Sequence, residues 1–408
     1  MIPSVYSDVL TAILRYAVPG LSLWIFARCA LKRGKIAKTL LLLTLLQALL
    51  ALSYFLQNPK ILPVGFLGLM GCQWLSFLLY KFQKQNAFET EILTFFLATF
   101  GFCGISAVCP EEGGKQLAAL VLGVLFFLFL RWILKEDKLV RLFIPIGTVV
   151  SVGLLLITLF FGETHYGAKC WLYIGGVSIQ PAESVKVFFL LAGSSARKKG
   201  EFFAFSVYTA AICLCLVLMN DFGTAFIFIF AYFVLAFLHY GAVMGLFVVT
   251  LPLLGGGIYS LAPHAFSRFA AWRHIWENPL DSGYQQTRAL MCMASGGLLG
   301  LGAGRGWMKN LFAADSDMII ATVCEEWGLL AVIILILAII TISLQAVRKN
   351  TLLSVSAAAV FLLQTALNAL GTVDILPLTG VTFPFLSNGG TAMLCTWGLL
   401  AFIQEGKT

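Results

Sequence analysis

Acidic and basic side chains occur within or beside long apolar stretches of this sequence, where ionisable groups are costly and mark candidate functional sites. Glu183 and Lys186 lie one helical turn apart, so they can pair on one face of a helix. They form either a structural ion pair or part of a binding site. Asp221 opens another apolar stretch, where it is either a helix N-cap or a functional carboxylate.

A second acidic group surrounds the start of a later apolar stretch. Asp315 and Asp317 precede this stretch, and Glu325 and Glu326 lie about two helical turns further on. Asp315 is a better candidate than Ser316 for the N-cap of a helix beginning at Met318, which leaves Asp317 to face a cavity. A carboxylate in such a position can accept a proton as a general base. A structural role for the two glutamates requires buried partners.

Between about residues 262 and 317 the chain becomes more polar and rich in glycine. The run Gly296–Gly306 has the composition of a phosphate-binding loop, but it lacks the strand–loop–helix context that such a loop needs. Five basic residues lie in the same segment, away from the basic clusters elsewhere in the chain: Arg268, Arg273, Arg288, Arg305 and Lys309.

The composition shows what kind of protein must position these groups. The chain has 408 residues, of which 60% are hydrophobic and 11% charged, whereas a soluble domain carries about 25% charged residues. In a bilayer, helices of about 20 apolar residues satisfy their own backbone hydrogen bonds. We therefore expect an all-α, polytopic membrane protein with about thirteen transmembrane helices. They fall near residues 9–31, 37–56, 61–82, 91–109, 115–134, 141–162, 183–194, 202–219, 222–238, 241–261, 318–346, 352–373 and 389–404.

Basic residues cluster in every second loop between these stretches, and basic loops mark the cytoplasmic side of a membrane. This pattern predicts an N-terminus outside, a cytoplasmic C-terminus, and a large outer loop between about 262 and 317. The net charge of +8 is then explained by cytoplasmic loops, and we expect no nucleic-acid partner. The basic residues of the predicted outer loop are exceptions to this preference for the cytoplasmic side. They therefore require an anionic partner, either a diphosphate or lipid headgroups.

From Gly167 to the C-terminus the chain resembles the SEDS proteins (shape, elongation, division and sporulation), the family of RodA, FtsW and SpoVE. Seven strings occur in the family's order: GAKCW (Gly167–Trp171), QPAESVK (Gln180–Lys186), NDFGT (Asn220–Thr224), NPLDSGYQ (Asn278–Gln285), SGGLLGLG (Ser295–Gly302), DSDMIIATVCEEWG (Asp315–Gly328) and ILPLTGVTFPFLSNGG (Ile375–Gly390). The chain departs from the family pattern at five positions. Cys170 replaces an arginine, Met219 and Asn220 replace a Gln-Pro pair, Asp315 replaces a histidine, and Asn388 replaces a tyrosine.

The resemblance implies a core of ten transmembrane helices, so about three helices are additional at the N-terminus. We accordingly divide the chain into the additional helices, residues 1–85, and a SEDS-like domain, residues 86–408. The implied activity is a peptidoglycan glycosyltransferase that polymerises lipid II at the outer face of a bacterial cytoplasmic membrane, in division, elongation or sporulation. The alternatives are a flippase for lipid-linked precursor and a non-catalytic scaffold of a cell-wall synthesis complex.

The resemblance also assigns residues and partners. The family's essential acid corresponds to Asp317. The residues expected to bind substrate are Glu183, Lys186, Asp221, Arg268, Gln285, Arg288 and Ser387. Arg288 is included for its charge, because the family usually has glutamine at that position. The charge that develops on the departing diphosphate needs either arginine and lysine or a divalent cation such as Mg or Mn, and we keep both options. The expected partners are lipid II, undecaprenyl-linked glycan, membrane lipids and a class B penicillin-binding protein with transpeptidase activity.

Overall fold

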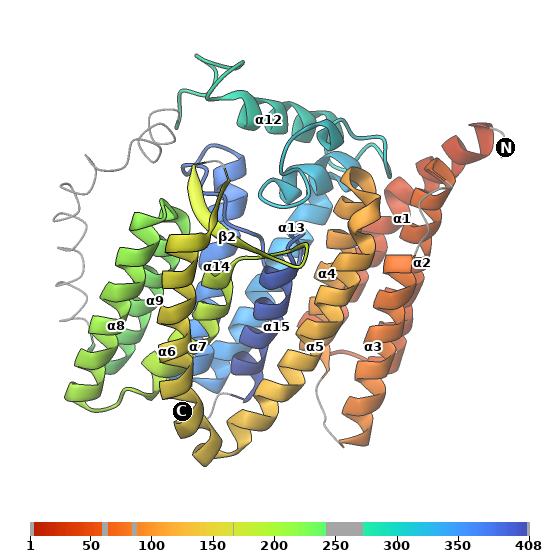
Figure 1. The fold of residues 1–408 in the computed structure, drawn as a ribbon. Helices are drawn as coiled ribbons and strands as arrows, with labels where there is room; N and C mark the ends of the chain where they lie inside the picture. Colours follow the sequence, from red (N-terminus) through yellow and green to blue (C-terminus); the bar gives the residue numbers. More distant parts are fainter. Residues whose placement is uncertain (1–3, 59–63, 84–87, 166, 242–271, 406–408) are drawn as a thin grey trace.

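In a computed structural model of the chain, most helices run side by side along one axis (Figure 1). The structure describes residues 4–58, 64–83, 88–165, 167–241 and 272–405. The first half contains α1 (Ser4–Ala30), α2 (Ile36–Gln57), α3 (Val64–Phe82), α4 (Glu89–Val108), η1 (Pro110–Glu112), α5 (Gly113–Lys135), α6 (Asp137–Phe161), α7 (Pro181–Ser195), α8 (Lys199–Leu218) and α9 (Phe222–Tyr240). The second half contains α12 (Tyr284–Gly296), η4 (Met308–Asn310), α13 (Ile319–Lys349), α14 (Leu352–Thr372) and α15 (Gly390–Glu405).

The expectation of a polytopic helical membrane protein is confirmed. Among the described residues, nine helices are long and apolar enough to cross a membrane. Large apolar side chains such as Val149 and Phe160 are exposed on α6, as expected for a helix that faces lipid. By contrast, most of α4 is buried inside the bundle. Of the thirteen predicted stretches, twelve contain a described helix, and the stretch 241–261 lies outside the described residues.

Apart from α12, which lies across one end of the bundle, the helices α1 to α9 alternate in direction, as do α13 to α15, and α1 begins and α15 ends at opposite ends (Figure 1). We call the end that carries α12 the α12 end. The segments before α5, α7, α13 and α15 all reach this end, and those before α13 and α15 contain two of the predicted site residues, Asp317 and Ser387. The basic residues at the ends of α1, α3, α5 and α13 lie at the opposite end.

The three N-terminal helices, which correspond to the predicted additional segment 1–85, pack directly on the rest of the bundle. Helix α1 packs against α2, α4 and α13, while α2 packs against α4 and α3 against α5. Over the described residues these three helices therefore share an interior with the remainder of the chain. The boundary near residue 85 remains a prediction.

A small antiparallel sheet between α6 and α7 was absent from the all-α prediction. Its strands are β1 (Glu163–His165), β2 (Ala168–Ile174) and β3 (Val177–Ile179), in the order β1-β2-β3. Gly175 and Gly176 connect β2 to β3 with φ values of 60° and 81°. A two-residue hairpin turn favours positive φ at both positions, which glycine adopts without strain. The Gly175-Gly176 pair is therefore the local sequence signal for this hairpin, which the all-α prediction did not include.

Helix α13 is broken at Gly328, whose φ and ψ are 85° and 167°. The glycine-rich segment after α12 pairs with the break: the Leu301 amide donates to the Glu325 carbonyl at 2.8 Å, and the Leu329 amide donates to the Gly297 carbonyl at 2.9 Å. A Cβ atom on Gly300 would lie 2.2 Å from the Glu326 carbonyl oxygen. These glycines therefore serve a close approach of two backbones, and this part of the run makes no phosphate-binding loop.

Candidate functional site

Asp317 lies in the turn that leads into α13, at the α12 end, and is half-buried. Three consecutive carbonyl groups of this turn accept hydrogen bonds from other parts of the chain. The backbone amide of Asn388 donates to the backbone carbonyl of Asp315 at 2.8 Å, and the Ser387 hydroxyl donates to the backbone carbonyl of Ser316 at 2.7 Å. The Asn368 side chain donates to the Asp317 carbonyl at 2.9 Å. The backbone that carries Asp317 is thus fixed by α14 and by the loop before α15.

Ser387, an expected substrate-binding residue, is buried, and its hydroxyl is engaged inside the protein. Besides donating to Ser316, it accepts a hydrogen bond from the Phe383 amide at 2.8 Å. Through these two hydrogen bonds Ser387 holds the loop before α15 against the turn that contains Asp317. The family string that contains Ser387 therefore meets the string that contains Asp317 in space, as a shared site requires.

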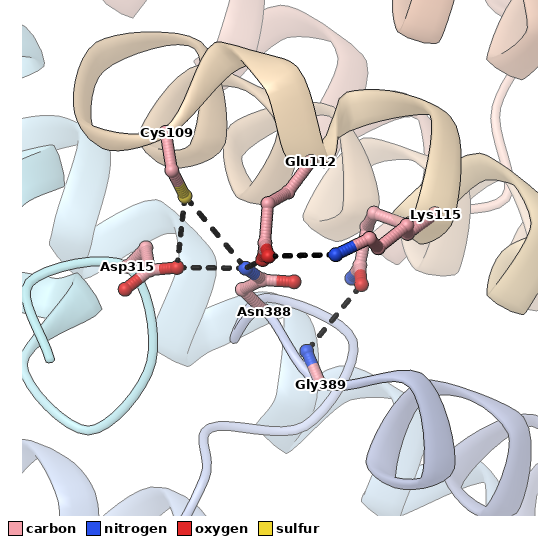
Figure 2. Close-up of polar contacts among 7 residues, drawn as sticks. Cys109, Glu112, Lys115, Asp315, Asn388 and Gly389 are labelled. Carbon is pink, nitrogen blue, oxygen red and sulfur yellow. Dashed lines mark hydrogen bonds and ion pairs between the residues drawn. The ribbon is translucent and has the colours of Figure 1, made fainter. Parts of the chain in front are cut away.

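The N-cap predicted at Asp315 is wrong. Helix α13 begins at Ile319 with Met318 at the N-cap, and no side chain caps it. Asp315 lies three residues before that N-cap, so its carboxylate is too early in the chain to reach the first helical amides. It accepts instead from the Asn388 side-chain amide at 2.7 Å and from the Cys109 thiol at 3.2 Å (Figure 2).

Figure 2 shows that this polar cluster joins three segments that are distant in sequence. The side-chain amide of Asn388 donates to the Glu112 carboxylate at 2.9 Å as well as to Asp315, and Glu112 forms an ion pair with Lys115 at 3.2 Å. The start of α5 is therefore connected to the turn of Asp317. The sequence offered no signal for this arrangement, because Cys109 and Glu112 precede every string that resembles the SEDS family.

The ligand atoms of Cys109, Glu112 and Asp315 lie within 4.8 Å of one another, a spacing that could hold a metal ion. Burial raises the pKa of the Cys109 thiol, and the neighbouring Asp315 carboxylate raises it further, so this sulfur stays protonated. Asn388 directs its NH₂ group, a donor, into the cluster. Mg and Mn prefer oxygen ligands. As arranged, these residues are a hydrogen-bonded cluster that does not fit either ion.

Glu183 and Lys186 form an ion pair at 2.7 Å on the first turns of α7, and both side chains are almost fully buried. Asp221 caps α9 by accepting from the Thr224 amide at 3.1 Å, which confirms the N-cap interpretation. Its second carboxylate oxygen is buried and has no hydrogen-bond partner among the described residues. Burial raises the pKa of Asp221; the Glu183 carboxylate also raises it, whereas Lys186 lowers it. Asp221 therefore interacts electrostatically with both members of the ion pair.

Helix α12 carries Gln285 and Arg288, the two expected substrate-binding residues between 262 and 317 that the structure describes. The Arg288 guanidinium lies 5.5 Å from the centre of the Tyr284 ring and 3.5 Å from the Met291 sulfur, and neither contact neutralises its charge. Gln285 is half-buried. Its neighbour Gln286 donates to the Gly371 carbonyl at 2.8 Å and so fixes α12 to the end of α14. Arg268 lies outside the described residues.

Glu325 and Glu326, for which the sequence required buried partners, both have them. The Glu325 carboxylate accepts from the Met308 amide at 2.8 Å. The Glu326 carboxylate accepts from the Tyr54 hydroxyl and from the Gly304 amide. Glu325 therefore attaches the loop between α12 and α13 to the end of the short segment before the break in α13, and Glu326 attaches that loop and α2 to it.

A family model for FtsW, RodA and SpoVE, described as a cell cycle protein, matches residues 111–407. Among curated proteins, the chain is 30% identical over 279 residues to the probable peptidoglycan glycosyltransferase FtsW of Borreliella burgdorferi, covering 63% of this chain and 76% of that protein. It is 29% identical over 328 residues to the protein of the same name from Bacillus subtilis, covering 71% and 80%.

Two solved structures share the fold. One comes from a study of structural coordination of polymerization and crosslinking by a peptidoglycan synthase complex, with a TM-score of 0.64 and 22% identity over 77% of this chain and 95% of that chain. The other is the rod shape determining protein RodA of Thermus thermophilus, with a TM-score of 0.56 and 22% identity over 78% and 95%. Nearly all of each solved chain is thus matched, while more than a fifth of this chain is additional.

Proposed function

This chain belongs to the FtsW/RodA/SpoVE family of cell cycle proteins, the SEDS family, and we propose that it is a peptidoglycan glycosyltransferase that polymerises lipid II into glycan strands. The names of its curated relatives support this activity. The observation that carries the proposal is the turn of Asp317, where three consecutive carbonyls are held by Asn388, Ser387 and Asn368. Such a turn positions a half-buried carboxylate, as a general base requires.

In the proposed reaction, Asp317 accepts the proton of the sugar 4-hydroxyl as that oxygen attacks the anomeric carbon of the growing glycan. The new glycosidic bond forms while the bond from the anomeric carbon to the undecaprenyl diphosphate breaks, and the electron pair leaves with the diphosphate. A positioned base contributes about 10²–10⁴-fold to such a step.

The diphosphate leaves with additional negative charge that needs nearby cations. Arg288 is our candidate among the described residues, since its contacts with Tyr284 and Met291 leave its charge uncompensated. Arg268 is the second candidate. A divalent cation is the alternative, for which the cluster of Cys109, Glu112 and Asp315 offers no suitable ligand set.

The α12 end would face outward, with the N-terminus outside and the C-terminus in the cytoplasm. The positions of the basic residues at the opposite end of the bundle support this orientation. The similarity to a chain from a peptidoglycan synthase complex supports a transpeptidase partner, a class B penicillin-binding protein in our proposal. Lipid II would enter from the bilayer, with its polyprenyl tail along apolar helix faces.

The test is polymer formation from lipid II by the purified protein in detergent. Asp317→Asn should remain folded and lose polymerase activity, because asparagine keeps the size and hydrogen bonding of aspartate without its basicity. Asp315→Asn is the matched control and should be much milder, because the new amide oxygen can still accept from Asn388. Near-parental polymerisation by Asp317→Asn would refute the general-base assignment.

The same assay separates the enzyme from the two alternatives, and transport of lipid II across vesicles separates those two from each other. A flippase would move lipid II across vesicles and form no polymer, and the buried charges Glu183, Lys186 and Asp221 are the feature that such a role would use. A scaffold would do neither. Equal loss of activity from Asp317→Asn and Asp315→Asn would indicate a shared metal site in place of a single base.

A further inference from the structure

Tyr54 connects the additional N-terminal helices to the break in α13. It lies near the end of α2 and is almost completely buried. Its hydroxyl donates to the Glu326 carboxylate and accepts from the indole nitrogen of Trp327 at 3.2 Å. The Tyr54 ring also packs edge-on against the Trp327 ring, with centroids 6.2 Å apart. One side chain of α2 therefore makes polar contacts with two consecutive residues of α13.

These two residues are the last ones before Gly328, where α13 is broken. The break divides α13 into a short segment, residues 319–327, and a long segment, residues 329–349. Continuous helical hydrogen bonds normally fix one turn relative to the next, but they are interrupted at this position. The angle between the two segments therefore depends on contacts from outside the helix.

The short segment begins two residues after Asp317. Its first end is held through the turn by Asn388, Ser387 and Asn368. Its second end is held by Tyr54 and by backbone pairing with the glycine-rich segment. A displacement of the second end would tilt the segment and move the carboxylate at the first end.

We propose that Tyr54 is a positioning residue: through Glu326 and Trp327 it fixes the short segment of α13 and thereby the placement of Asp317. The additional helices thus act as a built-in support for the catalytic turn. This inference rests on the proposed function for its kinetic consequence, whereas the mechanical connection can be measured without catalysis.

The decisive variant is Tyr54→Phe, which removes the hydroxyl and keeps the ring. We expect kcat to fall about 10-fold with KM for lipid II unchanged, which is less than the roughly 10²-fold that a 1 Å misplacement costs. The matched control is Tyr80→Phe on α3. The Tyr80 ring packs against Phe77 and Phe88, but its buried hydroxyl has no hydrogen-bond partner among the described residues, so kcat should not change.

A double-mutant cycle tests whether Tyr54 acts through Glu326. Glu326→Gln keeps an oxygen that accepts from the Tyr54 hydroxyl and should retain most of the activity, whereas Glu326→Ala should lower kcat as Tyr54→Phe does. Adding Tyr54→Phe to Glu326→Ala should then lower kcat by clearly less than 10-fold, because only the contact of the hydroxyl with Trp327 remains to be removed. A further 10-fold loss in the double variant would overturn the proposal, because the two residues would be acting independently.

Amide hydrogen exchange provides the readout that does not depend on activity. In Tyr54→Phe, the amides of residues 319–327 and of Leu301 and Gly302, which donate to the Glu325 and Glu326 carbonyls, should exchange faster than in Tyr80→Phe. Unchanged exchange would overturn the inference, as would an unchanged kcat. If the parental protein forms no polymer while exchange responds as expected, the proposed function fails and the mechanical connection stands.

Discussion

Removing one partner of the buried Glu183–Lys186 pair should destabilise the protein strongly. The two charges lie 2.7 Å apart, and their side chains are 7% and 3% exposed. Breaking such a pair costs about 3–5 kcal/mol, since the remaining charge stays buried without a partner. The two single variants should differ, because Asp221 interacts electrostatically with both residues. Glu183→Ala leaves Lys186 under the influence of the Asp221 carboxylate and should fall at the lower end of this range, whereas Lys186→Ala leaves two carboxylates without a cation and should fall at the upper end.

Replacing both residues gives the control for this prediction. A Glu183→Gln, Lys186→Met variant retains most of the side-chain volume and buries no unpaired charge, so it should be much closer to the parental stability. Thermal unfolding of the purified protein in detergent, followed for all four proteins, measures the order. The reasoning is refuted if either single variant unfolds with the parental protein, or if the double variant is no more stable than the single ones.

The double variant also decides between the two interpretations that the sequence left open for this pair. A stable double variant that still polymerises lipid II identifies a structural ion pair. A stable double variant without activity identifies a pair that substrate or product contacts, since stability has then been removed as an explanation.

Three further predictions concern the rest of the α12 end and the membrane topology. Gly300→Ala should destabilise the protein by more than about 3 kcal/mol, because its Cβ would meet the Glu326 carbonyl. Gly297→Ala has open space around the new Cβ and should cost only about 1–2 kcal/mol of backbone strain. Thermal unfolding compares the two variants. Arg288→Ala should weaken use of lipid II more than Arg288→Lys does, with the lysine variant also impaired because it loses the bidentate fork, and polymer yield against lipid II concentration measures both. Reporter fusions at the two termini should place them on opposite sides of the membrane, and a common side would refute the odd number of spans.

The helices were predictable because the signal is local: a run of about 20 apolar residues suffices, and each predicted stretch on described residues contains one. The meeting of Asp317 with Ser387 was implied by strings that resemble one family. The hairpin at Gly175 and Gly176 had a local signal as well, which the emphasis on helices left unused.

The contacts between distant segments were not predictable in the same way. Tyr54 and Glu326 are 272 positions apart, and a tyrosine in an apolar stretch gives no indication of its partner. Asp315 is an example. The local preference for aspartate at helix starts predicted an N-cap, but the side chain binds Asn388 and Cys109, which are distant in sequence. Pairings of this kind depend on how helices pack, which a single sequence does not specify.

The break in α13 also affects how the chain is made. When α13 first enters the membrane, the backbone groups freed at Gly328 have no partner within the helix, and each unsatisfied group in hydrocarbon costs several kcal/mol. Their partners belong to the segment between Gly297 and Gly302, which is synthesised earlier and lies outside any membrane-spanning helix. Neither segment can reach its final depth alone, so this end of the protein must be completed after insertion.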